Sequence, residues 1–505
     1  MTTHEIHGHP NAARFVDSAI RTRHEAGSMN TSTPTREIRS LIAGTWIEGS
    51  GTLAVLDKYR LQPCGRLHLP SREQVNAAVA AAHRAFMSCD LGPHERGAIL
   101  DRAADVLERR SDRLVHALQL EAGFTTSDAV GELRRCLQTF RLSAEEARRF
   151  VGDMVPLAGA PGQVGRIGFT LRVPLGVVCA ITPFNAPLNT VAHKVAPALA
   201  AGNAVILKPS SSTPTVANLM AEALLEAGLP PEMISVIHGG GAIAQWLLDE
   251  PAIRFYAFTG STDVGRSIQQ GAGLRRTQME LGSIAFTILS ESANLDVALP
   301  KVVGAAYRKA GQVCTSIQIL LVHRSLQAEV EARLTTLVQG LAYGDPEDPK
   351  TQVGPVISEA SAVRIERWIE DAVAHGAQRL AGGPRHGAVV PPTLLTRVDD
   401  AMTVSCEEIF GPVMSIMPFD TLQQAFNRVN ATPYGLATGI FTSQLDEAFK
   451  AVRRLQVGGV HINETSSSRV DLMPYGGSKD SGFGREGPHY AVREMSEERM
   501  VTISA

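Results

Sequence analysis

The chain has 505 residues, of which 44% are hydrophobic and 20% charged, with a formal net charge of −3. This composition indicates a globular protein of two or three domains and excludes a wholly disordered or collagen-like chain. The small net charge gives no sign of a nucleic-acid-binding surface, and no apolar run reaches the ~18 residues needed to span a membrane. The N-terminus lacks a secretory signal and the six cysteines form no CxxC pair, so we expect a cytoplasmic protein with reduced thiols and no bound metal.

The first part of the chain contains a polar segment followed by helices. Residues 1–35 are polar and lack periodicity, so we predict a flexible N-terminal extension. The residues Ser-Arg-Glu-Gln at 71–74 fit a capping box, and the apolar spacing after them predicts a helix that begins there. Amphipathic spacing predicts further helices over roughly 93–122 and 127–150.

From residue 175 short apolar strands alternate with helices. Strands are predicted at 175–182, 204–209, 234–238 and 255–259, and strands near 279–289 close the set. The intervening helices are predicted near 189–201, over 213–227, from 242 and from 263. Continuous apolar strands separated by helices indicate a parallel sheet covered on both faces. This doubly wound nucleotide-binding architecture binds ligands at the carboxyl ends of its strands.

A second β/α set follows, and one segment interrupts the first. We assign 36–151 and 173–282 to the dinucleotide-binding domain and 283–475 to a catalytic domain. The extended segment 152–172 and the C-terminal tail are predicted to form a small separate sheet, so 152–172 and 476–505 are assigned to oligomerisation. The exposed edges of such a sheet favour pairing with another subunit.

Three residues are candidates for catalysis from their surroundings alone. Cys314, in Gly-Gln-Val-Cys-Thr-Ser, has small neighbours that leave its thiol accessible, although a lone cysteine is usually a packing residue. Glu280 lies between Met279 and Leu281, where desolvation would raise its pKa toward that of a general base, but a solvated strand-end carboxylate is an alternative. Asn185 follows the first strand of the nucleotide domain, where it suits an oxyanion hole or a turn.

Seven motifs in order make the chain resemble the aldehyde dehydrogenase superfamily over residues 36–505. They are Pro-Phe-Asn (183–185), Leu-Lys-Pro-Ser (207–210), Phe-Thr-Gly-Ser-Thr-Asp-Val-Gly (258–265), Glu-Leu-Gly (280–282), Gly-Gln-Val-Cys (311–314), Glu-Glu-Ile-Phe-Gly-Pro-Val (407–413) and Pro-Tyr-Gly-Gly-Ser-Lys-Asp-Ser-Gly (474–482). The segments 469–477 and 484–488 are similar to the lactaldehyde and phosphonoacetaldehyde dehydrogenase branch. The resemblance implies a Rossmann-type nucleotide domain, an α/β catalytic domain and a small β oligomerisation flap.

The resemblance also implies the catalytic roles. Cys314 matches the thiol that attacks the aldehyde, passing through a thiohemiacetal and a thioester. Asn185 and the Cys314 N–H match the oxyanion hole, and Glu280 matches the base that activates water, which favours a free carboxylate product. Lys194 matches a family lysine sometimes placed in a proton path, with a structural ion pair as the alternative.

The same resemblance assigns a binding site for NAD or NADP, although GxGxxG is absent. Lys208 matches the ligand of the adenosine ribose, and Gly260 and Ser261 match the turn beside the phosphates. Glu408 matches the ligand of the nicotinamide ribose, with Phe410 beside it. The other residues assigned to the cofactor are Thr182, Pro183, Phe184, Ser211, Gly241 and Leu281. Ser211 stands where strict NAD users often carry Glu, so we expect NADP to be tolerated.

Three arginines suggest a small anionic aldehyde as substrate. Arg469 and Arg135 lie at positions similar to anion ligands of phosphorylated-aldehyde relatives, and Arg308 lies six residues before Cys314. A guanidinium binds phosphonate, phosphate, sulfonate or carboxylate groups in a bidentate manner. The alternative is that these arginines form ion pairs, and Val313 replaces the Arg that several phosphate-handling relatives place before the nucleophile.

Other functions stay open from the sequence. Within the family, the alternative substrate is a neutral lactaldehyde or a succinate-semialdehyde-type compound. Outside it, a cofactor-independent thiol esterase would use Cys314 alone, and a silent scaffold would be expected to lose Cys314 or Glu280. We expect a homodimer or homotetramer, a small aldehyde as the binding partner, and no nucleic acid or membrane partner.

Overall fold

The computed structural model describes residues 36–504, so the predicted extension 1–35 lies outside the described residues. Residues from Glu37 onward form one compact unit. The predicted capping box is confirmed, because the Gln74 N–H donates to Ser71 and the Ser71 N–H donates to Gln74 at 2.8 Å.

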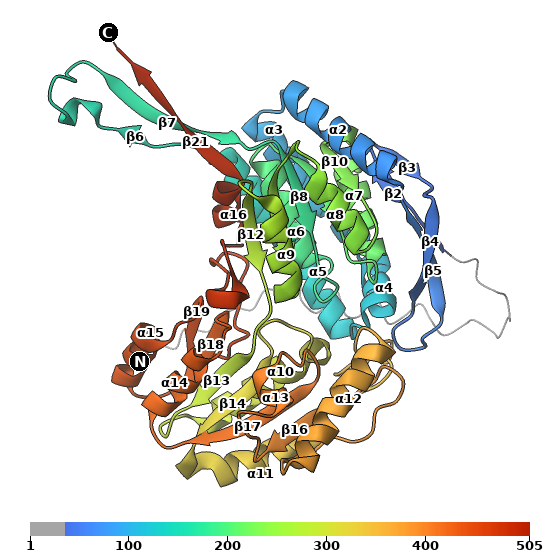
Figure 1. The fold of residues 1–505 in the computed structure, drawn as a ribbon, viewed down its shortest axis with the longest axis vertical. Helices are drawn as coiled ribbons and strands as arrows, with labels where there is room; N and C mark the ends of the chain where they lie inside the picture. The colour runs from blue at the N-terminus through green and yellow to red at the C-terminus, as the bar shows by residue number, and fades with distance from the viewer. Residues whose placement is uncertain (1–35, 505) are drawn as a thin grey trace, which may run out of the picture. The chain divides into compact units, whose positions relative to one another are not determined.

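An eight-stranded sheet forms the first large layer, in the order β20-β12-β11-β8-β9-β10-β2-β3 (Figure 1). Its five central strands are parallel, and the outer strands pair in the antiparallel sense. The strands are β2 (Ser40–Ile42), β3 (Thr45–Ile47), β8 (Val177–Ile181), β9 (Ala204–Lys208), β10 (Ile234–Val236), β11 (Ile253–Thr259), β12 (Arg276–Glu280) and β20 (Gly482–Phe483). Strands β8 and β9 are buried along their whole length, as expected of a parallel sheet covered on both faces.

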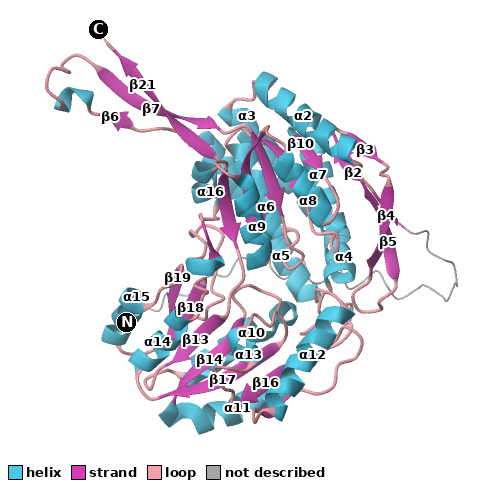
Figure 2. Ribbon diagram, in the orientation of Figure 1, coloured by secondary structure: helices cyan, strands magenta, loops and turns pink. Residues whose placement is uncertain are grey.

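Helices connect these strands and cover the sheet (Figure 2). They are α2 (Arg72–Ser88), α3 (Pro93–Arg109), α4 (Ser111–Ala122), α5 (Thr126–Arg148), α6 (Asn189–Ala200), α7 (Pro214–Glu226), α8 (Gly241–Asp249), α9 (Thr262–Ala272) and α16 (Pro488–Glu494). Because parallel crossovers are right-handed, α6 and α7 lie on one face and α8 and α9 on the other. Helices α3 and α5 pack outside α6, and α2 packs beside α8.

The strand order reverses next to β8, and this reversal places a ligand site. The chain runs from β8 through β9 to β10, and then returns to β11 on the other side of β8. In doubly wound sheets the crevice for a nucleotide lies at the carboxyl ends of the strands at such a switch point. The turns after β8 and β11 contain Asn185 and Gly260 respectively, so both predicted motifs lie at this edge.

A seven-stranded sheet forms the second large layer, in the order β15-β16-β17-β14-β13-β18-β19. Its strands are β13 (Ala285–Leu289), β14 (Ile317–His323), β15 (Gln378–Ala381), β16 (Thr393–Thr396), β17 (Val413–Phe419), β18 (Ala437–Phe441) and β19 (Gly459–Ile462). Its helices are α10 (Leu295–Tyr307), α11 (Gln327–Gln339), α12 (Glu359–Ala374), α13 (Thr403–Cys406), α14 (Leu422–Ala431) and α15 (Leu445–Arg454). All pairs are parallel except β15 with β16.

Two three-stranded sheets complete the fold. One consists of β1 (Arg36–Ile38), β5 (Pro63–Leu69) and β4 (Gly51–Leu56). The other consists of β6 (Met154–Val155), β7 (Ile167–Pro174) and β21 (Ser496–Ile503), and it extends away from the large sheets (Figure 1). The predicted combination of a doubly wound sheet, a second α/β layer and a small third sheet is confirmed.

The structure corrects two details of this expectation. The strands near 279–289 do not both close the first sheet, because β13 pairs with β14 and β18 of the second. The segment 476–505 is also not wholly part of the small sheet. Strand β20 pairs with β12, and α16 packs against α5 and α6, so that β21 alone joins β7. Apolar side chains of α16, including Val492, are buried in the core of the first domain, which explains the difference.

No helix among residues 36–504 is both long and apolar enough to span a membrane.

Candidate active site

The backbone before Cys314 adopts an unusual conformation. Lys309, Ala310 and Gly311 have φ values of 51°, 53° and 69°, which is a run of three left-handed residues. A Cβ at Gly311 would lie 2.0 Å from the Gly411 carbonyl oxygen, so only glycine fits. Left-handed non-glycine residues are costly and persist where the surrounding structure holds them, commonly at functional sites.

A buried ion pair joins this turn to the turn that contains Asn185. The Lys309 ammonium lies 2.6 Å from the Glu132 carboxylate and donates to the Asn185 carbonyl at 3.2 Å. Glu132 also accepts the backbone N–H of Asn189 at 2.8 Å at the start of α6. The turns of Cys314 and Asn185 are therefore held together by the side chains of Lys309 and of Glu132 on α5, with a backbone N–H from the start of α6.

The Cys314 thiol lies against the phenol of Tyr475, with 2.8 Å between Sγ and Oη. The Cys314 residue keeps part of its surface exposed. Its thiol is nonetheless surrounded by protein atoms, and burial raises its pKa to about 11. In the resting protein the sulfur is therefore mostly a protonated thiol at neutral pH.

Glu280 is buried at the end of β12, with only 3% of its surface exposed. Neither carboxylate oxygen has a hydrogen-bond partner among the described residues. Burial, followed by the nearby negative charge of Glu486, raises the pKa of Glu280 well above its ordinary value. A buried carboxyl group with free lone pairs and a raised pKa has the properties of a general base.

Gly476 leaves room beside this carboxyl group. A Cβ at Gly476 would lie 2.9 Å from Oε1 of Glu280 and 2.9 Å from Nη1 of Arg485. Glycine at this position therefore lets the backbone approach the base closely, and the Arg485 charge partly offsets the raised pKa of Glu280.

Lys194 is fully buried and pairs with Glu486 rather than reaching Glu280. The Lys194 ammonium lies 2.9 Å from one oxygen of Glu486, and the Arg469 guanidinium lies 2.9 Å from the other. Although burial opposes it, these two cations hold the pKa of Glu486 well below its ordinary value. The structural ion pair considered for Lys194 is therefore present, and both of its charges act on the pKa of the predicted base Glu280.

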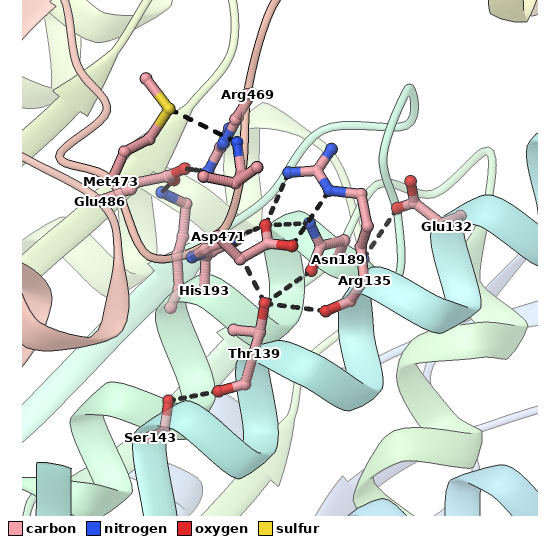
Figure 3. Close-up of polar contacts among 12 residues, drawn as sticks. Glu132, Arg135, Thr139, Ser143, Asn189, His193, Arg469, Asp471, Met473 and Glu486 are labelled. Carbon is pink, nitrogen blue, oxygen red and sulfur yellow. Dashed lines mark hydrogen bonds and ion pairs between the residues drawn. The ribbon is translucent and has the colours of Figure 1, made fainter. Parts of the chain in front are cut away.

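Asp471 is a second buried carboxylate on the same loop, and Figure 3 shows Arg135, Asn189 and His193 pointing toward it. Arg135 contacts both oxygens of Asp471, at 2.6 and 3.2 Å, while the Asn189 amide and the His193 ring lie 3.2 and 2.8 Å away. Although burial opposes it, His193 and Arg135 hold the pKa of Asp471 well below its ordinary value. The loop is thereby bound to α5 and α6.

Arg308 differs from the other two predicted arginines. Its guanidinium donates to the Ser467 hydroxyl at 2.8 Å, and Ser467 contacts Thr315 beside the nucleophile at 3.1 Å. No carboxylate forms an ion pair with Arg308 among the described residues. Burial lowers the pKa of Arg308, which indicates that its charge is desolvated without full compensation.

The predicted adenosine end of the cofactor site lies at β9. Lys208 is buried and has no carboxylate partner in the described part of the chain, and burial lowers its pKa to about 8. The hydroxyls of Ser211 and Thr182 are also buried without hydrogen-bond partners among the described residues. Buried polar groups normally find partners, so these three groups fit the hydroxyls of a nucleotide.

The predicted nicotinamide end lies where the two large domains meet. Glu408 accepts the Ser283 N–H at 2.9 Å, and burial raises its pKa to about 7. The rings of Phe184 and Phe410 form an edge-to-face pair with centroids 5.8 Å apart. A Cβ at Gly282 would lie 2.9 Å from Glu408, so glycine is needed for this approach.

The remaining cofactor candidates contribute in different ways. Gly241 begins α8 and has no atom within 4 Å of the position of a Cβ, so the space beside it is open. Ser261 caps α9 without a side-chain hydrogen bond, which leaves the N-terminus of that helix accessible to an anion. By contrast, the Gly260 N–H donates to the Glu280 carbonyl, and Leu281 packs against Gly265. Gly260 is therefore hydrogen-bonded to the backbone of the predicted base, a contact that the sequence did not suggest, and its assignment to the cofactor phosphates stays a prediction.

Pro183 lies in the turn between Thr182 and Phe184.

Taken together, the unpaired hydroxyls of Ser211 and Thr182, the free ammonium of Lys208 and the space at Gly241 fit a dinucleotide. No cluster of His, Cys, Asp or Glu that could hold a metal ion occurs between residues 36 and 504.

Four functional residues were missed by the reasoning from sequence: Tyr475, Glu486, Asp471 and Lys309. The first three lie inside quoted motifs, but a motif does not show which of its side chains points inward. Lys309 gave no signal, because its partner Glu132 is 177 residues away in the sequence.

Comparison with known proteins agrees with this geometry. The model of the aldehyde dehydrogenase family matches residues 46–501. The 3-sulfolactaldehyde dehydrogenase of Priestia aryabhattai is 41% identical over 477 residues, covering 94% of this chain and 100% of that protein. Its name agrees with the predicted lactaldehyde-like branch.

Solved structures show the same fold. Aldehyde dehydrogenase 21 of Physcomitrella patens, in complex with the reaction product succinate, has a TM-score of 0.91 and 34% identity, covering 94% of this chain and 99% of its own. The NADP-dependent glyceraldehyde-3-phosphate dehydrogenase of Bacillus halodurans, complexed with NADP, has a TM-score of 0.90 and 34% identity over 93% and 99% of the two chains. The chain therefore belongs to the aldehyde dehydrogenase family and is an oxidoreductase that uses NAD or NADP.

Proposed function

We propose that the chain oxidises a short aldehyde with an anionic group to the free carboxylate, and that Arg308 binds the anionic group. The observation that carries this proposal is that Arg308 has no carboxylate in hydrogen-bond contact among the described residues. Asp471 forms an ion pair with Arg135 and Glu486 forms one with Arg469, whereas the hydrogen bond of Arg308 goes to the Ser467 hydroxyl and Asp128 acts on its charge without contact. A desolvated guanidinium without a carboxylate in contact is costly unless a ligand supplies the negative charge.

The position of Arg308 supports the same substrate class. Its partner Ser467 contacts Thr315, the residue after the nucleophile, so an anion on Arg308 would lie a short distance from the reacting carbon. The names of the similar proteins include a sulfonated, a phosphorylated and a carboxylated compound. We therefore place sulfonate first among the candidate groups, with phosphate, phosphonate and carboxylate as further members of the class.

The catalytic residues account for the reaction as follows. The Cys314 thiol releases its proton to solvent, and its sulfur adds to the aldehyde carbon. The Asn185 amide and the Cys314 N–H stabilise the resulting oxyanion. Loss of a hydride from its carbon converts the thiohemiacetal into a thioester, and a bound NAD or NADP would supply the hydride acceptor. Lys208, Glu408 and the N-terminus of α9 are the groups that would hold the dinucleotide.

Glu280 then completes the turnover. Its carboxylate takes a proton from water, and the hydroxyl adds to the thioester carbon while the Cys314 sulfur leaves with the electron pair. The proton held by Glu280 then passes to the sulfur, so the products are the regenerated thiol and a carboxylic acid, which ionises to the free carboxylate. The free lone pairs of Glu280 and its raised pKa support this role. Lys194 contacts Glu486 instead, so we assign it to holding the loop that carries Gly476.

The first prediction separates the roles of the nucleophile and the base. Cys314→Ala should abolish turnover, whereas Glu280→Gln should release one equivalent of reduced cofactor per site and then stall, because hydride transfer precedes hydrolysis. Stopped-flow absorbance at 340 nm measures both the burst of reduced cofactor and the turnover that follows it. Glu291→Gln, at an exposed position after β13, serves as the control. Absence of the burst in folded Glu280→Gln with cofactor bound would show that this division of roles is wrong.

The second prediction concerns the 2′-phosphate of NADP. Ser211 is buried without a partner near Lys208, so NADP should bind within a thousandfold of NAD. Ser211→Glu should weaken NADP binding by at least about tenfold relative to NAD, because the new carboxylate repels the phosphate. Tryptophan fluorescence titration without aldehyde measures the dissociation constants of NAD and NADP. Ser211→Gln, which adds bulk without charge, should leave the ratio nearly unchanged, and an equal loss in both variants would contradict the charge argument.

The third prediction tests the anion anchor. A hydrogen bond to a charged group contributes about 1.5–3 kcal/mol, so Arg308→Gln should lower kcat/KM for 3-sulfolactaldehyde by about 10- to 150-fold. For propanal, which has no anion, the change should stay below about threefold. The values of kcat/KM for succinate semialdehyde and phosphonoacetaldehyde then rank carboxylate and phosphonate against sulfonate as the preferred anionic group.

Two further variants control this comparison. Arg367→Gln, at an exposed position of α12, should leave kcat/KM unchanged for both substrates. Arg469→Gln should lower kcat/KM by the same factor for both substrates, because Arg469 pairs with Glu486 and packs on Tyr475. Equal losses for sulfolactaldehyde and propanal in Arg308→Gln would contradict the anchor and favour a neutral lactaldehyde.

We also propose that the small sheet of β6, β7 and β21 joins two copies of the chain. Strand β21 is an edge of this sheet and has no further partner strand among residues 36–504. Apolar side chains on it and its neighbour are exposed, with 52% of Ile167 and 45% of Met500 accessible. An unpaired edge with apolar side chains favours pairing with another chain.

The fourth prediction tests this assembly. Light scattering after size exclusion should give a dimer or tetramer, and Met500→Lys should shift the protein toward smaller species because a charge is placed at the contact. Phe449→Lys, which changes an exposed side chain of α15, should leave the mass unchanged. A monomeric wild-type protein at micromolar concentration would contradict the proposal.

A further inference from the structure

The phenol of Tyr475 has no role in the reaction as described, yet it contacts the reacting atom. Its hydroxyl lies 2.8 Å from Sγ of Cys314, and the residue is buried, with 8% of its surface exposed. The carbon atoms of a phenylalanine would fill the same space, so the hydroxyl requires an explanation of its own. A buried hydroxyl is costly without a hydrogen-bond partner, and the sulfur of Cys314 is the partner that the structure provides.

The ring of Tyr475 is held from two sides. The Arg469 guanidinium carbon lies 3.7 Å from the ring centroid, which is a close cation–π contact. The backbone of Tyr475 exchanges two hydrogen bonds with Glu486, at 3.1 and 2.7 Å. The phenol is therefore fixed before any substrate binds, and the contact with the sulfur requires no rearrangement.

The same loop is fixed at its other end. Asp471, four residues before Tyr475, is bound by Arg135, Asn189 and His193 of α5 and α6 (Figure 3). Since both ends are held by buried charged contacts, the position of the hydroxyl relative to Cys314 is set by the fold rather than by a flexible side chain.

The direction of the hydrogen bond follows from proton affinities. Burial raises the pKa of Tyr475 well above its ordinary value, so the phenol keeps its proton at neutral pH. A thiol can donate or accept, but a thiolate can only accept. Once Cys314 is deprotonated, the phenol must therefore be the donor and the sulfur the acceptor.

We propose that Tyr475 is a hydrogen-bond donor that stabilises the Cys314 thiolate and fixes its sulfur for attack. This inference rests on the proposed role of Cys314 as the nucleophile. It adds a group that favours the reactive form of a thiol in a largely desolvated site. Hydrogen bonds to ionised groups are stronger than those between neutral groups, so the contact strengthens when the proton leaves.

Other charges also act on the thiol, and a test must keep them constant. The titratable and charged groups that face it are Tyr475, Glu280, Arg469, Glu408 and Arg308. Tyr475→Phe removes only the hydroxyl and retains the ring on which Arg469 packs. The variant therefore changes one hydrogen bond and no formal charge at neutral pH.

The experiment measures the ionisation of Cys314 without substrate or cofactor. Iodoacetamide alkylates the thiolate, with a carbon–sulfur bond formed and iodide released, so its rate reports the deprotonated fraction. The rate at Cys314 is followed by peptide mass spectrometry as a function of pH, because the chain has five further cysteines. Tyr475→Phe should raise the midpoint by about one to two pH units and slow alkylation at pH 8 by about 10- to 100-fold.

Controls separate this effect from a change in the fold. Tyr343→Phe alters an exposed tyrosine and should leave the midpoint unchanged. If Tyr475→Phe unfolds, 3-fluorotyrosine at position 475 keeps the ring and is a stronger donor, so it should lower the midpoint. An unchanged or lowered midpoint in folded Tyr475→Phe, or an unchanged midpoint with 3-fluorotyrosine, overturns the proposal.

The two proposals can fail independently. Alkylation involves no aldehyde, so its result does not depend on whether the substrate is anionic. With aldehyde and cofactor present, Tyr475→Phe should slow the burst of reduced cofactor equally for sulfolactaldehyde and propanal. A loss confined to the anionic aldehyde would instead place Tyr475 in substrate binding and contradict its action on the thiol.

Discussion

Compensation of buried charge between one loop and two helices is the constraint on which the active site depends. The segment between β19 and α16 carries Asp471 and Glu486, and these carboxylates bind cations on α5 and α6. Removing one partner of a buried pair typically costs about 3–5 kcal/mol, because the other charge is left unpaired. Tyr475 and Gly476 lie between the two carboxylates in sequence, so the contacts of the nucleophile and of the base are set by the same pairs.

The same accounting of charge distinguishes binding groups from structural ones. Arg135, Arg308 and Arg469 are alike in the sequence, but their partners differ. Two of them form ion pairs with carboxylates of the protein, whereas within residues 36–504 the third forms a hydrogen bond to a hydroxyl and no ion pair. Glu280 and Lys208 follow the same logic, since each is buried without an opposite charge in hydrogen-bond contact among the described residues. Buried charged groups that the protein itself does not pair are therefore the ones available to bind substrate, water and cofactor.

The sequence was sufficient for the architecture, and it proposed three central residues of the site. Apolar strands alternating with helices indicated the doubly wound sheet, and ordered motifs identified Cys314, Glu280 and Asn185. It was insufficient where a result depended on pairing over long distances. Strand β13 reads like its neighbours in the sequence, but pairing with β14 and β18 places it in the other sheet. The partners of the arginines and of Gly260 could not be predicted, because carboxylates and carbonyl groups elsewhere in the chain supply them.

The crossing between β12 and β13 has a consequence for how the enzyme can be divided. Glu280 and Asn185 belong to the first large sheet, whereas Cys314 precedes a strand of the second. Each half of the chain therefore contains an incomplete set of reacting groups. A fragment that ends at residue 282 retains the base without a nucleophile, and its complement retains the nucleophile without the base. Chimeras that exchange halves between relatives must preserve the interface as well as the motifs, since catalysis is a property of the contact and of neither half alone.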